Sequence, residues 1–323
     1  MKAQAIALLS GGLDSILAVK VIVDQGIHVH GVTFKTPFFG PEKALRAAKA
    51  IGLPTTVIDI TDAHLEMLKS PRYGYGRHMN PCIDCHTLMI HEAGKFMEAT
   101  KAHFIITGEV MGQRPMSQGK QTLALIAKNS GYGDLVLRPL SARLLPETKP
   151  EREGLVDRER LLAIQGRSRK AQLALAAHYG ITEYSTPAGG CLLTDPAFSR
   201  RLKDLFLHSP HPTKREIELL KYGRHFRISD RIKIIVGRNS EDNKAILSLV
   251  EEKDDVFQLV NHPGPTVVIP GGGDEKSRAL AAGLCVLYGG KETRLVCLTS
   301  AEGMSTMKAE APDHELITRF ILS

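Results

Sequence analysis

The stretch from Ala3 to Gln25 reads AQAIALLSGGLDSILAVKVIVDQ, and it decides the fold of the first half of the chain. An apolar run is followed by two adjacent glycines, then by apolar residues at helical spacing as far as Gly26. This order predicts a strand, a tight turn and a helix. The glycines let the backbone approach a bound anion, and the free N–H groups of a helix start favour phosphate. Asp14 or Ser15 is expected to cap the helix.

The turn itself, Ser10 to Ser15, reads SGGLDS. Its spacing is neither that of the Walker loop nor that of the dinucleotide GxGxxG motif. It resembles the SGGxDS signature of the PP-loop ATP pyrophosphatases, and all of the fixed positions match. The resemblance implies an enzyme that adenylates a substrate with ATP and releases pyrophosphate. An ordinary strand-to-helix turn without a ligand is the alternative.

Strands and helices alternate behind this turn. We expect strands at 27–34, 55–60, 104–107 and 136–140, with a helix at 41–51. This alternation predicts an α/β fold with a parallel sheet and right-handed crossovers. The PP-loop resemblance implies a HUP-like nucleotide-binding domain, and a smaller α+β domain is expected to follow it. Two more helices are expected at 149–165 and 169–179.

The strand ends and the loops that follow them are the expected ATP site, because ligands of such sheets bind at the carboxyl ends of the strands. The run from Gly108 to Gln118 resembles the TGE…GQ…SQ segment of 4-thiouridine synthetases. The resemblance implies that Asp14 is catalytic and helps to hold Mg²⁺. From their positions past the second strand and in the loop after 104–107, Lys35 and Arg114 are expected to lie near the phosphates. The expected ATP-binding residues are Ser10, Gly11, Gly12, Asp14, Ser15, Thr33, Phe34, Gly108, Gln113, Ser117 and Gln118.

The cysteines form the second candidate site. Five cysteines are an odd number, and with no secretion signal in the sequence they favour metal binding or catalysis over a disulfide framework. The segment 80–86, NPCIDCH, follows an expected irregular stretch at 61–80 and precedes an expected helix at 87–100. It resembles the NPCxxC stretch of tRNA 2-thiouridylases. That resemblance implies that Cys191, which follows two glycines, works together with Cys82 and Cys85 as a catalytic residue.

Three interpretations of these cysteines remain open. The first is a [4Fe–4S] cluster held by Cys82, Cys85 and Cys191, as in cluster-dependent tRNA thiolation enzymes. The second is persulfide chemistry without a metal, in which one thiol carries sulfur and another resolves it. The third is a structural zinc site that His86 completes.

The last third of the chain has a different pattern, with short strands and turns from about Phe226. The order VGRN…N…DD…PGP…VVI resembles the R domain of NFACT proteins, which implies RNA binding; a packing or dimerisation module is the alternative. The net charge of +7 and the pI near 9.1 agree with a polyanionic partner. Eleven Lys or Arg face four Asp or Glu between residues 200 and 238. The expected RNA-binding residues are Arg200, Arg201, Arg224, Arg227 and Arg238.

These observations predict three segments: a catalytic domain at 1–182, a basic connecting segment with the third cysteine at 183–225, and an NFACT-R-like domain at 226–323. No apolar run is long enough to cross a bilayer, so we expect a cytoplasmic protein without a membrane partner. The oligomeric state is left open.

The leading hypothesis is an ATP-dependent tRNA sulfurtransferase that replaces a nucleobase oxygen by sulfur. Its expected partners are tRNA and a sulfur donor, either sulfide or a protein that carries a persulfide. Two alternatives come from other classes: a PP-loop enzyme that amidates or ligates a small metabolite and has a structural zinc site, and a non-catalytic RNA-binding adaptor.

Overall fold

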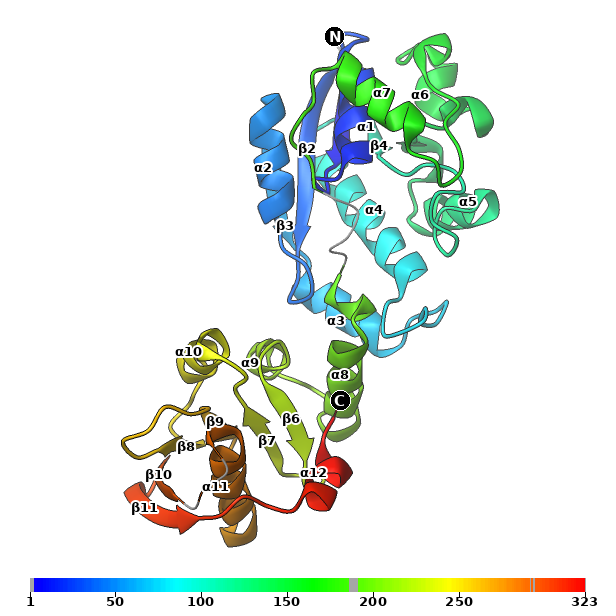
Figure 1. Ribbon diagram of the computed structural model, residues 1–323. Helices are drawn as coiled ribbons and strands as arrows, with labels where there is room; N and C mark the ends of the chain where they lie inside the picture. Colours follow the sequence, from blue (N-terminus) through cyan, green and yellow to red (C-terminus); the bar gives the residue numbers. More distant parts are fainter. Residues whose placement is uncertain (1–2, 186–190, 291, 293, 323) are drawn as a thin grey trace. The chain divides into compact units, whose positions relative to one another are not determined.

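The computed structural model describes residues 3–185, 191–290, 292 and 294–322. The chain forms two compact units, Met1–Thr194 and Asp195–Ser323 (Figure 1). The boundary between them lies inside the segment 183–225 that the sequence set apart as a connector. Cys191 therefore belongs to the first unit, and the basic helices that follow belong to the second.

The first unit is built on a five-stranded parallel sheet with the order β3-β2-β1-β4-β5. Its strands are β1 (Gln4–Leu8), β2 (His28–Lys35), β3 (Thr55–Asp59), β4 (Phe104–Thr107) and β5 (Val136–Leu137). The central strand β1 pairs with β2 on one side and with β4 on the other. Because the chain turns to opposite sides after β1, the carboxyl ends of β1 and β4 form a topological switch point, where ligands of open α/β sheets bind.

Helices cover both faces of this sheet. On one face α1 (Leu13–Val23), α2 (Glu42–Ile51) and α7 (Lys170–His178) share one buried apolar cluster. On the other face α4 (Cys82–Ala99) and α5 (Lys120–Asn129) share a second. Short elements complete the unit: α3 (Thr61–Lys69), α6 (Lys149–Arg152) and the 3₁₀ turns η1 (Gly133–Leu135), η2 (Ala142–Leu144), η3 (Arg158–Arg160) and η4 (Leu192–Thr194). The predicted fold class is confirmed.

Three local predictions in this unit are wrong. The stretch at 61–80 is not wholly irregular, because 61–69 form α3, which buries His64 and Leu68. Helix α4 begins at Cys82, five residues earlier than expected. The helix expected at 149–165 is only the single turn α6, since Gly154 takes a left-handed φ of 70° and ends it.

The second unit contains a six-stranded antiparallel sheet with the order β11-β10-β8-β9-β7-β6. Its strands are β6 (Arg224–Arg227), β7 (Lys233–Val236), β8 (Asp255–Leu259), β9 (Val267–Ile269), β10 (Arg294–Ser300) and β11 (Gly303–Ala309). Its helices are α8 (Pro196–His208), α9 (Lys214–Leu219), α10 (Ser240–Ser248), α11 (Glu275–Gly289) and α12 (His314–Phe320). Helix α10 begins at Ser240, and the Asn239 side chain caps it by accepting from the Asp242 N–H at 2.8 Å.

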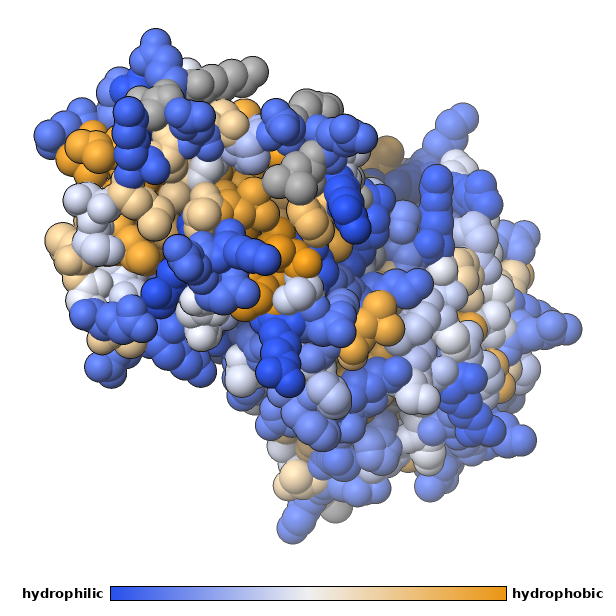
Figure 2. Space-filling view, turned by 90° about the horizontal axis from the view of Figure 1, so that it is seen from below, coloured by the Kyte–Doolittle hydropathy of each residue, from blue (hydrophilic) through white to orange (hydrophobic). Residues whose placement is uncertain are grey.

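Alternate residues of these strands face opposite sides, as the period of two requires. Ile234 and Val236 pack with the apolar side of α11, whereas Ile235 packs with Leu219 at the end of α9 and with Ile246 of α10. Figure 2 shows apolar side chains gathered among hydrophilic ones on the surface of this unit. In the described part of the chain, no helix is both long and apolar enough to span a membrane.

Candidate functional site

The glycine turn between β1 and α1 is shaped by close packing. Gly11 has a φ of 76°, and a Cβ placed on it would lie 2.4 Å from the Lys43 carbonyl oxygen at the start of α2. Only glycine fits both restrictions. The N-cap of α1 is Gly12, so neither Asp14 nor Ser15 caps the helix, and within the described residues no side chain caps the first turn of α1. The dipole and the first N–H groups of α1 are therefore suited to an external anion.

The serine hydroxyl groups of the turn form hydrogen bonds within the turn. Ser15 Oγ donates to the Gly12 carbonyl at 2.8 Å, and the Gly12 N–H donates to Ser10 Oγ at 3.3 Å. Ser10 and Ser15 also lie 3.3 Å apart through their hydroxyl oxygens. Both serines are therefore bound within the loop.

The end of β4 lies directly behind this turn. A Cβ on Gly108 would lie 2.5 Å from the Ser15 nitrogen, so the two strand ends touch through backbone atoms. Gln113, in the loop after β4, donates from Nε2 to Asp14 Oδ2 at 2.9 Å. The other carboxylate oxygen, Asp14 Oδ1, is buried and has no hydrogen-bond partner in the described structure. The structure thus brings Asp14, Gly108 and Gln113 together as the motifs predict.

The three expected cysteines also converge. Cys82 and Cys85 lie in the first turn of α4, and the charges of Cys191 and Cys82 contribute to a raised pKa of the Cys85 thiol, after its burial. The pKa of Cys191 is raised to about 12, chiefly by burial and in smaller part by the charge of Cys82. The thiols are close enough to affect one another's protonation. They are not yet arranged as ligands, since no three His, Cys, Asp or Glu side chains of the described residues form a ready metal site.

A buried histidine lies against one of these thiols. His64 lies on α3, is wholly buried, and contacts the Cys85 sulfur through Nε2 at 3.5 Å. Its ring lies 5.4 Å from that of Phe38, whose carbonyl accepts from the Leu192 N–H at 3.2 Å. Burial lowers the pKa of His64 to about 4, so the ring is neutral at pH 7. The chain around Cys191 is in this way anchored beside Cys85.

A buried carboxylate connects the thiols to the strand end. Glu109 accepts from His86 Nδ1 at 2.8 Å and from Arg138 Nε at 2.9 Å. Burial alone would raise the pKa of Glu109, but the charge of Arg138 and the hydrogen bond from His86 outweigh it and lower the pKa to about 2. His86 follows Cys85 in the chain, and Glu109 follows Gly108. The hydrogen bond between His86 and Glu109 therefore connects the helix start that carries the thiols to the strand end beside the glycine turn.

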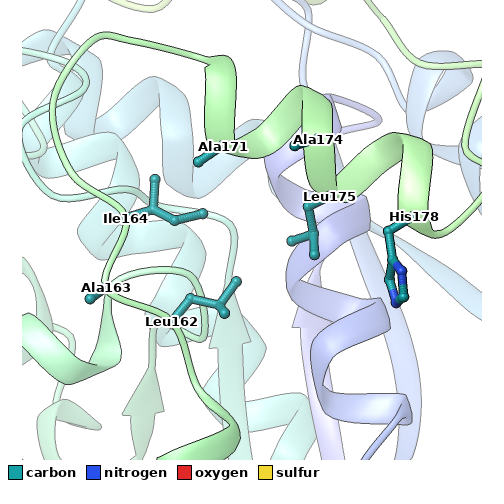
Figure 3. Close-up of a pocket in the computed structure, with 7 residues that line it drawn as sticks. All are labelled: Leu162, Ala163, Ile164, Ala171, Ala174, Leu175 and His178. Carbon is teal, nitrogen blue, oxygen red and sulfur yellow. The ribbon is translucent and has the colours of Figure 1, made fainter.

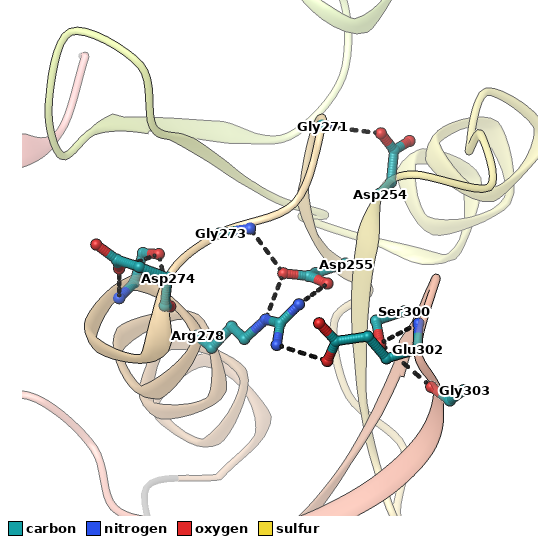
Figure 4. Close-up of polar contacts among 10 residues, drawn as sticks. Asp254, Asp255, Gly271, Gly273, Asp274, Arg278, Ser300, Glu302 and Gly303 are labelled. Atoms are coloured by element: carbon teal, nitrogen blue, oxygen red, sulfur yellow. Dashed lines mark hydrogen bonds and ion pairs between the residues drawn. The ribbon is translucent and has the colours of Figure 1, made fainter.

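The second unit has a glycine loop of its own between β9 and α11, at 270–274 (Figure 4). Asp254 and Asp255, both buried, accept from the N–H groups of Gly271 and Gly273, each at 2.8 Å. The guanidinium of Arg278 binds Asp255 through Nε and Nη2 at 2.9 and 3.1 Å. The carboxylates occupy the positions that an external anion would need.

Most of the arginines expected to bind RNA are engaged inside the second unit. Arg201 is buried and donates to the Gly223 carbonyl, and Arg227 binds Asp204 at 3.0 and 2.7 Å. Arg238 binds Asp242, and the guanidinium of Arg224 lies 4.6 Å from the Tyr288 ring centre. Of the five, Arg200 and Arg238 are exposed.

Comparison with protein families supports these assignments. Residues 1–143 match the family model described as "Thiamine biosynthesis protein (ThiI)". The N-terminal unit is a PP-loop domain. Residues 223–320 match the model described as "NFACT protein RNA binding domain". Both resemblances expected from the motifs are confirmed.

Curated relatives match part of the chain. A tRNA-specific 2-thiouridylase MnmA of Clostridium acetobutylicum is 33% identical over 127 residues, which cover 33% of this chain and 36% of the relative. A probable tRNA sulfurtransferase of Ureaplasma parvum serovar 3 is 31% identical over 147 residues, 43% of this chain and 37% of the relative. The chain thus spans little more than a third of the length of either. A solved 4-thiouridine synthetase–RNA complex with bound ATP is 22% identical, with a TM-score of 0.36, over 57% of this chain and 54% of that one.

The other expected ATP-binding residues lie at the same edge of the PP-loop domain in different surroundings. Thr33 and Phe34 are buried near the end of β2, and the Phe34 ring packs in the apolar cluster under α4. Only backbone atoms there are left to meet a base. Ser117 and Gln118 are buried in the loop after β4, where the Gln118 carbonyl accepts from the Gly112 N–H at 2.7 Å.

Sequence reasoning missed several residues of this edge. Glu109, Arg138 and His64 were not singled out as site residues, although Glu109 lies inside a motif that was. Gln172 of α7 was missed as well; its Nε2 lies 3.4 Å from Gln113 Oε1. A buried polar residue in an apolar helix is the signal that could have found it, since such groups are retained for a partner.

A shallow groove on the PP-loop domain is a different feature. It runs between residues 162–164 and α7, and its lining is apolar except for His178 (Figure 3). Leu162, Ile164 and Leu175 form its floor and walls. None of its lining residues is among the glycine-turn or thiol residues, so we do not assign chemistry to it.

Proposed function

We propose that this protein is an ATP-dependent tRNA sulfurtransferase, in which the PP-loop domain activates a nucleobase oxygen and thiols at the same edge supply or bind sulfur. The observation that carries the proposal is that the chain beside Cys191 is held next to Cys85, through Phe38 and His64, in the unit that holds the glycine turn; Cys82 lies in the same helix turn as Cys85. Cys191 comes from a part of the chain more than a hundred residues away from the other two. A metabolite ligase has no need for such a set of thiols beside its ATP site.

The connection between the two sites supports a shared reaction. The His86–Glu109 hydrogen bond joins the start of α4 to the end of β4, and Gly108 touches the turn at Ser15. On the other side, the Ser185 N–H donates to the Gly11 carbonyl at 3.1 Å, six residues before Cys191. Two separate segments thus lead from the glycine turn to the thiols.

The first step is adenylation. The nucleobase carbonyl oxygen attacks the α-phosphorus of ATP, the bond from that phosphorus to the bridging oxygen breaks, and pyrophosphate leaves with the electron pair. The uncapped start of α1 and the glycine turn stabilise the departing charge. The unpartnered Asp14 Oδ1 suits Mg²⁺, which would screen the phosphates.

The second step replaces oxygen by sulfur. A hydrosulfide attacks the activated carbon, and AMP leaves with the oxygen. If a persulfide attacks instead, a second protein thiol must then attack the sulfur of the first cysteine, so that the sulfur–sulfur bond breaks, the thiolated base leaves and a protein disulfide forms. A [4Fe–4S] cluster held by Cys82, Cys85 and Cys191 would supply an open iron that binds this sulfur. The donor set fits such a cluster, since three soft thiols converge, although they must draw together to hold it. His86 is bound through Nδ1 to Glu109, which leaves its Nε2 able to complete the alternative zinc site.

The decisive experiment measures two products with purified protein, unmodified tRNA, ATP, Mg²⁺ and sulfide under anaerobic conditions. We expect tRNA-dependent release of pyrophosphate and a thiolated nucleoside after digestion of the tRNA. Pyrophosphate released only with a small amine or carboxylic acid would favour the ligase, and no release with any RNA would favour the adaptor.

Cys191→Ala tests the thiols. This variant should lose thiolated nucleoside by at least a hundredfold and keep ATP binding, because the thiol lies outside the glycine turn. Cys297→Ser is the matched control, since Cys297 is a half-buried cysteine of the second unit. Unchanged thiolation in the Cys191 variant would remove this residue from the site.

The match of residues 223–320 to an RNA-binding domain supports tRNA as the partner of the second unit. Its exposed basic side chains, such as Arg200, are suited to phosphate contact. We assign this unit the role of holding the tRNA.

A further inference from the structure

Three buried polar atoms without partners lie on Asp14 and at the start of α7. They are Asp14 Oδ1, Gln172 Oε1 and Arg169 Nε, and in the described structure none of them has a hydrogen bond. Gln172 is wholly buried. Arg169 is the N-cap of α7 and Gln172 lies three positions later, so both side chains lie on one side of the helix start. Buried polar groups are normally bonded, so such a group points to a missing partner.

A chain of hydrogen bonds fixes how these groups are oriented. The Asp14 carboxylate can only accept, so Gln113 must turn its Nε2 towards it, as the 2.9 Å bond shows. The Gln113 oxygen then faces Gln172, which must present its own Nε2, at 3.4 Å. The Gln172 oxygen is thereby left as an acceptor without a donor. The orientation of both amides thus follows from the charge of Asp14.

The segment 166–172, with the sequence GRSRKAQ, lies against the loop that carries Gln113. The Gly166 N–H donates to the Met111 carbonyl at 2.8 Å, and Met111 also forms a parallel bridge with Gln165. This segment therefore lies across from the glycine turn, with Asp14 and Gln113 between them. It brings a guanidinium and a helix start to a place already lined by the uncapped start of α1.

We propose that segment 166–172 is the second wall of the triphosphate site, in which Arg169 binds the phosphates that leave as pyrophosphate and Gln172 is a positioning residue for Asp14. This inference rests on the proposed function, since it assigns further residues to its ATP site. A magnesium triphosphate offers both kinds of missing partner. Its phosphate oxygens accept from Arg169, and its metal-bound waters donate to the Asp14 and Gln172 oxygens.

Arg169→Gln tests the phosphate contact in the full-length protein by calorimetric titration with ATP plus Mg²⁺ and, separately, with AMP. We expect the affinity for ATP to fall at least tenfold and that for AMP to change less than twofold, because AMP lacks the β- and γ-phosphates. Arg169→Lys should recover part of the loss. Lys49→Gln is the control: it removes an exposed charge in the last turn of α2, outside segment 166–172, and should leave ATP affinity unchanged.

Gln172→Met tests the positioning role, since methionine keeps the volume and removes both polar atoms. The Mg²⁺ concentration for half-maximal ATP binding should rise at least threefold, with AMP affinity unchanged. Gln113→Met removes the same chain of bonds from a half-buried position and should give the same shift without the risk of misfolding. The double variant with both substitutions should show the same rise in the Mg²⁺ concentration as either single variant.

Two results separate this inference from the proposed function. If the wild type binds ATP and thiolates tRNA but Arg169→Gln keeps full ATP affinity, or loses AMP affinity equally, segment 166–172 is not part of the triphosphate site. If the wild type binds no ATP, the proposed function itself fails and this inference fails with it. Additive shifts from Gln113→Met and Gln172→Met would overturn the positioning role of Gln172.

Discussion

Two glycine turns between a strand and a helix have opposite chemistry. Between β1 and α1, no side chain of the described residues caps the helix, and the buried Asp14 Oδ1 has no hydrogen-bond partner among them. Between β9 and α11, Asp274 caps the helix by accepting from the Ser277 N–H at 2.8 Å, while Asp254 and Asp255 bind the N–H groups of the loop glycines. A glycine loop at a helix start is therefore not by itself an anion site. It becomes one where the chain supplies no carboxylate of its own.

The largest effect on activity that we expect from this contrast comes from substituting Asp14. Asp14→Ala should lower tRNA-dependent pyrophosphate release at least a hundredfold, because it removes both the magnesium-facing oxygen and the partner of Gln113. Release of pyrophosphate from ATP is the measurement. Asp230→Ala serves as control, since that carboxylate is almost fully exposed in the second unit and should have no effect on release. If Asp14→Ala stays fully active, the turn between β1 and α1 has only a structural role.

The Glu109 carboxylate should give the largest effect on stability. Glu109→Gln leaves the buried Arg138 without its counter-charge, at a cost of about 3 kcal/mol in the free energy of unfolding at pH 7. Urea denaturation followed by circular dichroism measures it.

The difference in unfolding free energy between the wild type and Glu109→Gln should depend on pH in one direction. The pKa of Glu109 is about 2 in the folded protein, below its ordinary value of 4.5, so the unfolded chain binds more protons between these values. Its stabilisation is therefore complete above pH 4.5 and is lost as the pH falls towards 2. The gap between wild type and variant should narrow over this range, and a constant gap would mean that the carboxylate is not held ionised.

Two glycines with the same backbone conformation allow a matched comparison of the turns. Gly11 and Gly271 have φ values of 76° and 78°, but a Cβ meets backbone atoms at 2.4 Å only at Gly11 and finds nothing within 4 Å at Gly271. Gly271→Ala should cost about 1 kcal/mol for the left-handed conformation alone. Gly11→Ala should cost more and weaken ATP binding as well. If Gly11→Ala and Gly271→Ala lost the same free energy of unfolding in thermal denaturation, α2 would have to move away from residue 11 without cost.

The smallest expected effect is on RNA binding. Arg200→Gln should weaken tRNA binding two- to threefold and reduce the slope of log affinity against log salt by about one, because one exposed phosphate contact is lost. Arg201→Gln is the contrast: its guanidinium is buried and bonded to the Gly223 carbonyl, so stability should fall instead. An unchanged salt slope for Arg200→Gln would move the RNA contact to other residues.

Motifs predicted the parts of the site whose chemistry is local. The SGGxDS turn, the end of β4 and the CxxC pair were all located from residue order, because a tight turn or a helix start needs particular residues at fixed spacing. Sequence could not predict that α4 begins at Cys82 or that 61–69 form a helix, since these depend on packing of His64 and Leu68 against the rest of the unit.

By itself the sequence determined a glycine turn between a strand and a helix, an alternating α/β sheet and a basic second unit, because local backbone preferences and apolar periodicity need no distant partner. Tertiary structure alone decided which polar groups are left free. It buried Arg201 and paired Arg227, although both read as exposed basic residues, and it placed Gln172 beside Gln113 from 59 residues away. Only the folded chain brings such groups together, so only there does burial make an unpaired oxygen or guanidinium a sign of a ligand.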